Sequence, residues 1–194
     1  MRILSSFVFF VLALLSVTIS SYSQLPMSSK KSSEKFVVYQ MMFHLWGNKQ
    51  TELVRNGSYT QNGVTKFKDV SDVALKALKN KGISHLYATG LIEHATMEDF
   101  TAYGSPLDHP SVVKGRAGSP FAIKDYYDVN PFLASDPAKR MEEFEEMLKR
   151  IHQAGLFLIL DFVPNHLARQ YYSDKKPKGV VDFGVHDQVD KAFD

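Results

Sequence analysis

Short hydrophobic runs and helical periods alternate along this chain. Nearly continuous apolar runs lie within Lys35–Leu45, Ile83–Thr89 and Leu156–Leu160. Between them, apolar residues recur every three or four positions over Asp69–Lys81 and again over Asp136–Gln153. Runs of this length predict buried strands, and the three-to-four spacing predicts amphipathic helices. The alternation predicts an α/β fold, because a strand, a helix and a strand in this order form a crossover between parallel strands.

Both predicted helices carry terminal signals. Asp69 or Ser71 can cap the first helix, and Gly82 can end it. In the second helix Asp136 is the N-cap and Pro137 occupies the first helical position, which proline favours. These elements fit either a doubly wound sheet or a (β/α)8 barrel, and the pattern alone does not separate the two.

The third apolar run ends in a cluster of polar residues. Leu156–Leu160 is apolar without interruption, and Gly155 precedes it. A strand without alternation is typical of a parallel sheet that helices cover on both faces, and the carboxyl end of such a strand opens on the ligand crevice. Asp161, Asn165 and His166 follow at that end. We therefore expect the chemistry of the protein at this position.

Three segments lack a regular apolar period. Within Thr51–Lys66, two Asn-Gly pairs are turn signals that could frame a small hairpin. Gly90–Lys124 is rich in glycine and proline, and a long loop after a strand is more often functional than a mistaken assignment. Leu167–Asp194 reads as a third long excursion where a helix would be expected, so the chain resembles the front of a larger protein.

Composition excludes several classes of function. The chain is 44% hydrophobic and 23% charged, as in an ordinary globular protein, and its net charge is only +2. The basic residues are scattered, which argues against nucleic-acid binding. The chain has no cysteine, so disulfides, thiolate metal sites and cysteine nucleophiles are excluded.

The first residues predict export. Arg2 is followed by the apolar run Phe7–Leu15, and small residues precede Gln24. This is the pattern of a secretory signal over residues 1–23, with cleavage before Gln24. The apolar run is shorter than the roughly 20 residues that a spanning helix needs, so we expect no stable membrane insertion after cleavage. Residues 24–35 are interpreted as a flexible leader, and the mature protein is expected in the periplasm or outside the cell.

Each polar residue of the cluster has more than one interpretation. Asp161 could be a general acid or base, a metal ligand or an acceptor for backbone N–H groups, and we favour the last because no second carboxylate accompanies it. Asn165 could offer its carbonyl oxygen to a hard cation such as calcium, or could be a turn residue. His166 could bind a substrate hydroxyl or simply pack in a loop. These alternatives stay open for single residues.

Together, the residues resemble a known family. The string Asp161–His166 (DFVPNH) is similar to the first signature motif of the α-amylase family of glycoside hydrolases, which ends the third barrel strand. Ser119–Pro131 (SPFAIKDYYDVNP) resembles the family's segment after the second strand. The resemblance implies the N-terminal portion of a (β/α)8 barrel, with about three strands and two helices over residues 36–166. Residues 167–194 would begin the loop domain that follows.

The family implies a role for four residues. His166 would hydrogen-bond hydroxyls of the sugar at the cleavage point, and Phe121 would stack on that sugar in a place where the family usually has tyrosine. Asn165 corresponds to a calcium ligand in many members, with the other ligands outside this chain. Asp161 would be structural. Gly90 stands where proline is frequent, which indicates a divergent branch.

The implied activity is retaining hydrolysis of α-1,4 bonds in an α-glucan substrate. The family's nucleophile, its acid/base and its transition-state-stabilising carboxylate lie on later strands, so we expect them beyond residue 194 and expect the 194-residue chain alone to be inactive. A transglycosidase shares every residue visible in this chain. A non-catalytic relative that acts as a binding protein, like the heavy subunits of amino-acid transporters, is the alternative from another class.

Overall fold

The computed structural model describes residues 35–185. The predicted signal peptide and all but the last residue of the predicted leader lie outside the described residues. The same holds for residues 186–194, which form the last part of the predicted third excursion.

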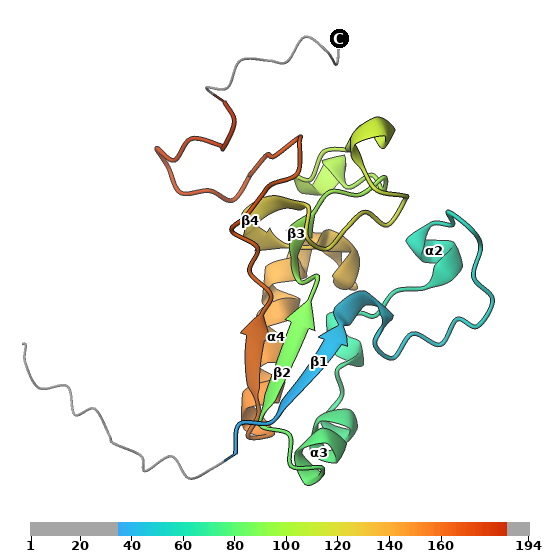
Figure 1. Ribbon diagram of the computed structural model, residues 1–194, viewed down its shortest axis with the longest axis vertical. Coiled ribbons are helices and arrows are strands. Elements are labelled where there is room, and N and C mark those ends of the chain that lie inside the picture. Colours follow the sequence, from blue (N-terminus) through green and yellow to red (C-terminus); the bar gives the residue numbers. More distant parts are fainter. Residues whose placement is uncertain (1–34, 186–194) are drawn as a thin grey trace, which may run out of the picture. The chain divides into compact units, whose positions relative to one another are not determined.

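Three parallel strands form the main sheet, in the order β1–β2–β5 (Figure 1). Their bounds are β1 Val38–Met42, β2 His85–Thr89 and β5 Phe157–Leu160. Leu86 lies between Tyr39 and Leu158 in the register. The prediction of parallel strands in an α/β fold is therefore confirmed.

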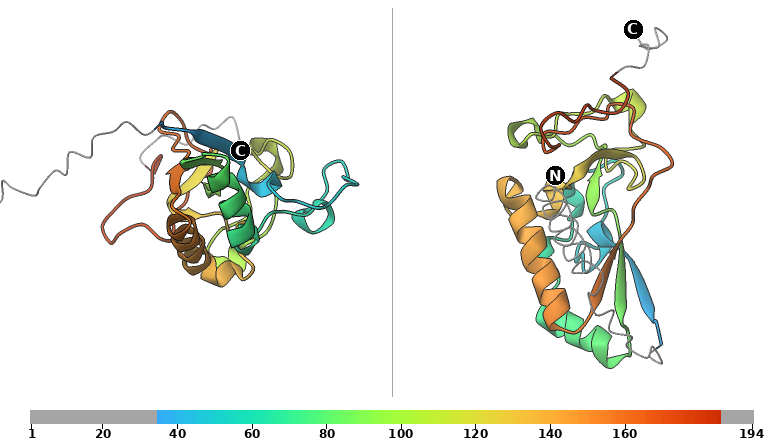
Figure 2. Two further views of the ribbon diagram at one scale, coloured as in Figure 1. Left: turned by 90° about the horizontal axis from the view of Figure 1, so that it is seen from below. Right: turned by 90° about the vertical axis from the view of Figure 1, so that its left-hand side faces the viewer.

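One long helix precedes each of the later strands of this sheet. α3 spans Asp72–Asn80, and the Ser71 side chain accepts a hydrogen bond from the backbone N–H of Ala74. α4 spans Arg140–Gln153 after a single 3-10 turn, Pro137–Lys139, in which Asp136 accepts from the N–H of Ala138. Figure 2 shows both helices on the same side of the three strands. Successive strand–helix units with their helices on one face make up the N-terminal portion of a (β/α)8 barrel, as predicted.

The core lies between the sheet and the two helices. Leu86 on β2, Leu75 on α3 and Met147 and Ile151 on α4 have no exposed surface. On the other face of the sheet no described element covers the strands, and Phe157 is 58% exposed. The prediction that helices cover both faces is wrong for the described residues. Each right-handed crossover puts its helix on the same face, so the two crossovers leave the second face open.

A second, antiparallel sheet lies beyond the carboxyl end of β2. It consists of β3, Ile92–His94, and β4, Ile123–Val129. The prediction of an irregular segment over Gly90–Lys124 missed β3 and the start of β4. Both strands are rich in polar and charged residues that are buried, so they lack the apolar pattern by which strands are recognised. Short 3-10 turns occupy other parts of the chain: Phe43–Leu45, Phe67–Asp69, Thr101–Tyr103, Pro110–Val112 and Pro131–Leu133.

The hairpin expected in Thr51–Lys66 is wrong. This segment contains the single helical turn α2, Tyr59–Asn62. Ser58 and Gln61 form a reciprocal capping box, in which each side chain accepts from the other residue's backbone N–H. The Asn62 side chain exchanges hydrogen bonds with the backbone of Val54. Side-chain bonds to the local backbone satisfy the groups that a hairpin would otherwise pair, and they favour a turn.

Residues 167–185 contain no helix or strand, as predicted for this part of the chain. Among the described residues, no helix is both long and apolar enough to cross a membrane.

Candidate functional site

Asp161 is the first residue after β5, and β2 holds its carboxylate. The phenol of Tyr87 donates to Oδ1 and the hydroxyl of Thr89 donates to Oδ2, each at 2.8 Å. The N–H of Asp161 also donates to the carbonyl of Ala88 at 3.3 Å. The hydrogen bond to Asp161 raises the pKa of Tyr87. Since both carboxylate oxygens already accept from the neighbouring strand, this geometry fits a structural role for Asp161.

Tyr126 on β4 holds the rest of the motif from the other side. Its phenol donates to the carbonyl of Val163 and lies 3.4 Å from the carbonyl of His166. Its ring lies 5.3 Å from that of Phe162 and 6.0 Å from that of Tyr171. The motif is thus fastened to β2 through Asp161 and to β4 through Tyr126.

The side chains of Asn165 and His166 are exposed and lie next to each other. The Asn165 amide nitrogen lies 3.3 Å from Nδ1 of His166. If the amide donates there, the other ring nitrogen carries the proton and can donate to a ligand. Both residues follow the carboxyl end of β5, so the structure places them at the edge of the sheet where ligands bind in parallel α/β folds.

Phe121 precedes β4, and its ring is 44% exposed. The backbone just before Phe121 is tightly packed. Gly118 has a φ of +73°, and a Cβ there would overlap the carbonyl oxygen of Ala95. Within the described residues, Phe121 makes no hydrogen bond or ring contact with the motif. The structure therefore brings Asp161, Asn165 and His166 together on one segment but does not join Phe121 to them.

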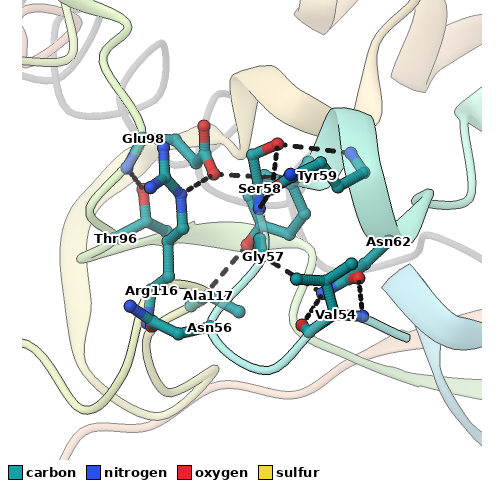
Figure 3. A network of polar contacts seen from close by, with 11 residues as sticks. Val54, Asn56, Gly57, Ser58, Tyr59, Asn62, Thr96, Glu98, Arg116 and Ala117 are labelled. Carbon is teal, nitrogen blue, oxygen red and sulfur yellow. Dashed lines mark hydrogen bonds and ion pairs between the residues drawn. The ribbon is translucent and has the colours of Figure 1, made fainter.

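A polar network fastens the segment around α2 to the loop that leads to Phe121 (Figure 3). Glu98 accepts from Nε of Arg116 at 2.7 Å and from the N–H of Tyr59 at 3.2 Å. The phenol of Tyr59 donates to the carbonyl of Ala117 at 3.1 Å, and burial raises its pKa. The N–H of Arg116 donates to Asn56 at 3.0 Å. These bonds join two loops that the sequence had left irregular.

Asn165 does not by itself build a calcium site. Calcium takes about six to eight oxygen ligands, most of them from carboxylates and carbonyls. Asn165 supplies one exposed amide oxygen. Within residues 35–185, the only group of three or more acidic or histidine side chains with converging ligand atoms lies elsewhere, at Glu93, Asp125 and Asp128. The described residues therefore do not supply the donor set for calcium at Asn165, and that role stays a prediction.

Sequence reasoning missed the residues that position the motif. Tyr87, Thr89 and Tyr126 carry no signal of their own, since tyrosine and threonine are common in strands. Tyr126 lies in Ser119–Pro131, the segment that resembles the family, but its contact with Val163 joins residues far apart in the chain and could not be inferred from the sequence. The buried carboxylates at Glu93, Asp125 and Asp128 were also missed.

Replacing Asp161 with asparagine tests its role at the strand end. The side-chain NH2 of asparagine would face the hydroxyl of either Tyr87 or Thr89, and that hydroxyl would lose its acceptor. We therefore expect the free energy of unfolding to fall by about 1–3 kcal/mol. Tyr87→Phe and Asp161→Asn should be less than additive when combined, because both remove the same bond. Urea denaturation measures this, with Lys76→Gln at an exposed position in the middle of α3 as a control near zero. If the losses of stability in Tyr87→Phe and Asp161→Asn add in full, the hydrogen bond between Tyr87 and Asp161 does not contribute to stability.

The sequence matches curated proteins over short stretches. It is 44% identical to a glycogen debranching enzyme of Klebsiella pneumoniae over 43 residues, which are 22% of this chain and 6% of that protein. It is 37% identical to the amino acid transporter heavy chain SLC3A1 of Mus musculus over 57 residues, 29% of this chain and 7% of that protein. It is 25% identical to pullulanase A of Streptococcus pneumoniae over 107 residues, 53% of this chain and 8% of that protein.

Among solved structures, an α-amylase from Lactobacillus plantarum is similar over 70% of this chain and 24% of that chain, with a TM-score of 0.46 and 21% identity. No protein-family model matches the sequence. The matched part of the chain spans 6% to 8% of the length of the three curated proteins. The chain is thus similar, over short stretches, to a glycogen debranching enzyme, a pullulanase and an amino acid transporter heavy chain, and its motif at the end of β5 resembles the first signature motif of the α-amylase family of glycoside hydrolases.

Proposed function

We propose that this chain is part of an exported, α-glucan-active glycoside hydrolase that cleaves α-1,4 bonds with retention. The observation that carries the proposal is the position of the motif Asp161–His166. It directly follows β5, at the carboxyl edge of the parallel sheet, where barrel enzymes bind their substrates. The matches to a glycogen debranching enzyme and to a pullulanase support a glucan as the substrate.

In this proposal the chain supplies sugar contacts. His166 is exposed and can donate to a sugar hydroxyl, and Phe121 has an exposed ring face that can stack on a sugar. Asp161 and Tyr126 position the motif, since they hold its two ends against β2 and β4. Asn165 would coordinate calcium through its side-chain oxygen, together with ligands outside the described residues.

The catalytic carboxylates are proposed to lie outside the described residues. Retaining hydrolysis needs two carboxylates roughly 5 Å apart on either side of the scissile bond. Within residues 35–185, the acidic side chains that converge are Glu93, Asp125 and Asp128, and all three are buried. Asp161 has both oxygens engaged by β2. None of these groups is placed to attack a sugar.

Binding of an α-1,4-linked glucan oligosaccharide tests the sugar contacts. Calorimetric titration of the 194-residue chain should show weak binding, and His166→Ala and Phe121→Ala should each reduce the affinity about tenfold or more, because each removes a hydrogen bond or a stacking surface. Phe157→Ala is the matched control, since this exposed phenylalanine lies at the other end of β5. Equal affinity in all variants would reject the assigned contacts.

The same preparation tests where catalysis resides. The 194-residue chain should release no reducing sugar from starch, and release by this chain would show that the catalytic groups lie within it. A longer product of the same reading frame should release the α-anomer first, as seen by proton NMR. Release of the β-anomer would reject retention.

A non-catalytic binding protein is the second candidate, and the match to an amino acid transporter heavy chain favours it. The two candidates differ in whether catalytic carboxylates accompany the described strands. An Asp, a Glu and an Asp at later strand ends would support the hydrolase, and their loss would support the binding protein. A transglycosidase would differ by transferring glucosyl units to a sugar acceptor instead of to water.

Export is part of the proposal and has its own test. If residues 1–23 are a secretory signal, a secreted preparation should begin at Gln24 when its N-terminus is determined by mass spectrometry. Retention of Met1 in protein recovered from the cell envelope would instead indicate an uncleaved anchor.

A further inference from the structure

Three buried carboxylates meet where β3 pairs with β4, away from the motif Asp161–His166. Glu93 is 2% exposed, Asp125 is 0% and Asp128 is 3%. One oxygen from each lies within 4.8 Å of the other two. Glu93 and Asp125 are direct partners in the antiparallel ladder. Like charges directly opposite each other destabilise a sheet, so this pairing needs compensation.

The hydrogen bonds of the cluster are incomplete. Ser105 donates to Oε1 of Glu93 at 2.5 Å, and the N–H of Tyr127 donates to Oδ1 of Asp125 at 2.7 Å. The second oxygen of each side chain, Oε2 of Glu93 and Oδ2 of Asp125, is buried and has no hydrogen-bond partner. The buried hydroxyl of Ser173 lies beside the Asp125 carboxylate. Buried carboxylate oxygens without a hydrogen-bond partner are energetically costly, and a cation bound between them would offset that cost.

The basic residues beside the cluster are paired with Asp108, which lies outside the cluster, and with Asp128, which belongs to it. Lys124 lies 2.8 Å from Asp108, and Nη2 of Arg140 lies 2.5 Å from Asp128. Among the described residues, Glu93 and Asp125 form no ion pair. Two carboxylates are therefore buried without a basic partner. Burial of such charges is costly unless a cation or a proton neutralises them.

We propose that Glu93, Asp125 and Asp128 bind a divalent cation with a preference for oxygen ligands, and that this cation is calcium. Three carboxylate oxygens that lie within 4.8 Å of one another can reach a single ion. Calcium accepts a flexible arrangement of oxygen ligands, whereas magnesium requires a near-ideal octahedron. This site is distinct from the one predicted at Asn165.

The cation would fasten the segment that follows the motif. The N–H of Ala168 donates to the carbonyl of Ile123 at 2.8 Å, and the N–H of Tyr172 donates to the carbonyl of Lys124 at 3.1 Å, so this segment runs along β4. Ser173 comes next in the chain, and its buried hydroxyl can complete the ligand set. The ion would then join β3, β4 and the exit from the motif.

Calcium binding to the metal-free chain tests the proposal. After treatment with a chelator and dialysis, equilibrium dialysis with radioactive calcium should show one ion bound per chain, and calcium should raise the melting temperature more than magnesium does. Glu93→Gln removes one charge with little change of shape and should weaken calcium binding at least tenfold. Asn165→Ala should keep the bound ion.

Three results would overturn the proposal: no calcium bound to the unchanged chain, undiminished binding to the Glu93→Gln variant, or loss of the ion in Asn165→Ala. If the unchanged chain binds no calcium and the Glu93→Gln variant is more stable than the unchanged chain at neutral pH, a proton neutralises the cluster instead of a cation. The stoichiometry of the unchanged chain decides the matter even if Glu93→Gln fails to fold. No outcome of this test bears on glucan hydrolysis, so it stands apart from the proposed function.

Discussion

Replacing Arg140 with methionine is expected to lower the free energy of unfolding by roughly 3–5 kcal/mol, because it leaves a buried carboxylate without its partner. Nη2 and Nε of Arg140 donate to Oδ2 of Asp128 at 2.5 and 2.9 Å, and Nη1 donates to the carbonyl of Pro137 at 3.0 Å. Arg140 and Asp128 are both buried. Nη2 of Arg140 also lies 3.7 Å from Asp174, so removal of the guanidinium should also weaken the attachment of the segment that follows the motif.

Urea denaturation of three variants checks this prediction. Lys175→Met is the matched control, since Lys175 pairs with Asp174 at 3.0 Å on the surface and exposed pairs contribute at most about 1 kcal/mol. Combining Arg140→Met with Asp128→Asn should recover part of the loss, because the double variant no longer buries an unpaired charge. A loss in Arg140→Met no larger than that in Lys175→Met would contradict the role of the buried pair.

Acid is expected to destabilise the protein through His94. Burial lowers the pKa of His94 from 6.5 to about 4, and the nearby His44, whose own pKa is lowered by burial, acts in the same direction. Nδ1 of His94 accepts from the Asn130 amide at 2.9 Å, and Nε2 donates to the carbonyl of Ala117 at 3.2 Å, so the ring is held neutral. Protonation of Nδ1 would remove the acceptor of the hydrogen bond from Asn130.

The direction of the pH effect follows from proton uptake. Below about pH 6.5 the unfolded chain protonates His94 while the folded chain does not, so the free energy of unfolding falls as the pH drops from 6.5 to about 4. The full effect is on the order of 3 kcal/mol. Urea denaturation across this range should show a smaller slope for His94→Gln than for the unchanged protein. His152→Gln, at an exposed position on α4, should keep the original slope. Equal slopes for all three would exclude His94 as the group responsible.

Elements with a strong local pattern were predicted well. β1, β2 and β5 lie within the predicted runs, and Ser71 caps α3 as predicted. Asp136 caps the 3-10 turn that leads into α4, while α4 itself begins only at Arg140. Capping bonds join residues two or three positions apart, so the sequence contains the whole interaction. The second sheet was not predicted, because its strands bury acidic residues in place of an alternating apolar face.

The sequence by itself determined the α/β alternation and the position of Asp161, Asn165 and His166 directly after a strand. It did so because hydrophobic periods, caps and strand ends are properties of neighbouring residues. Only the tertiary structure decided that Tyr87 and Thr89 hold Asp161, that Tyr126 holds the far end of the motif, and that Glu93 faces Asp125. Those contacts join segments far apart in the chain and depend on strand register, and a shift of one residue would turn each side chain to the opposite face.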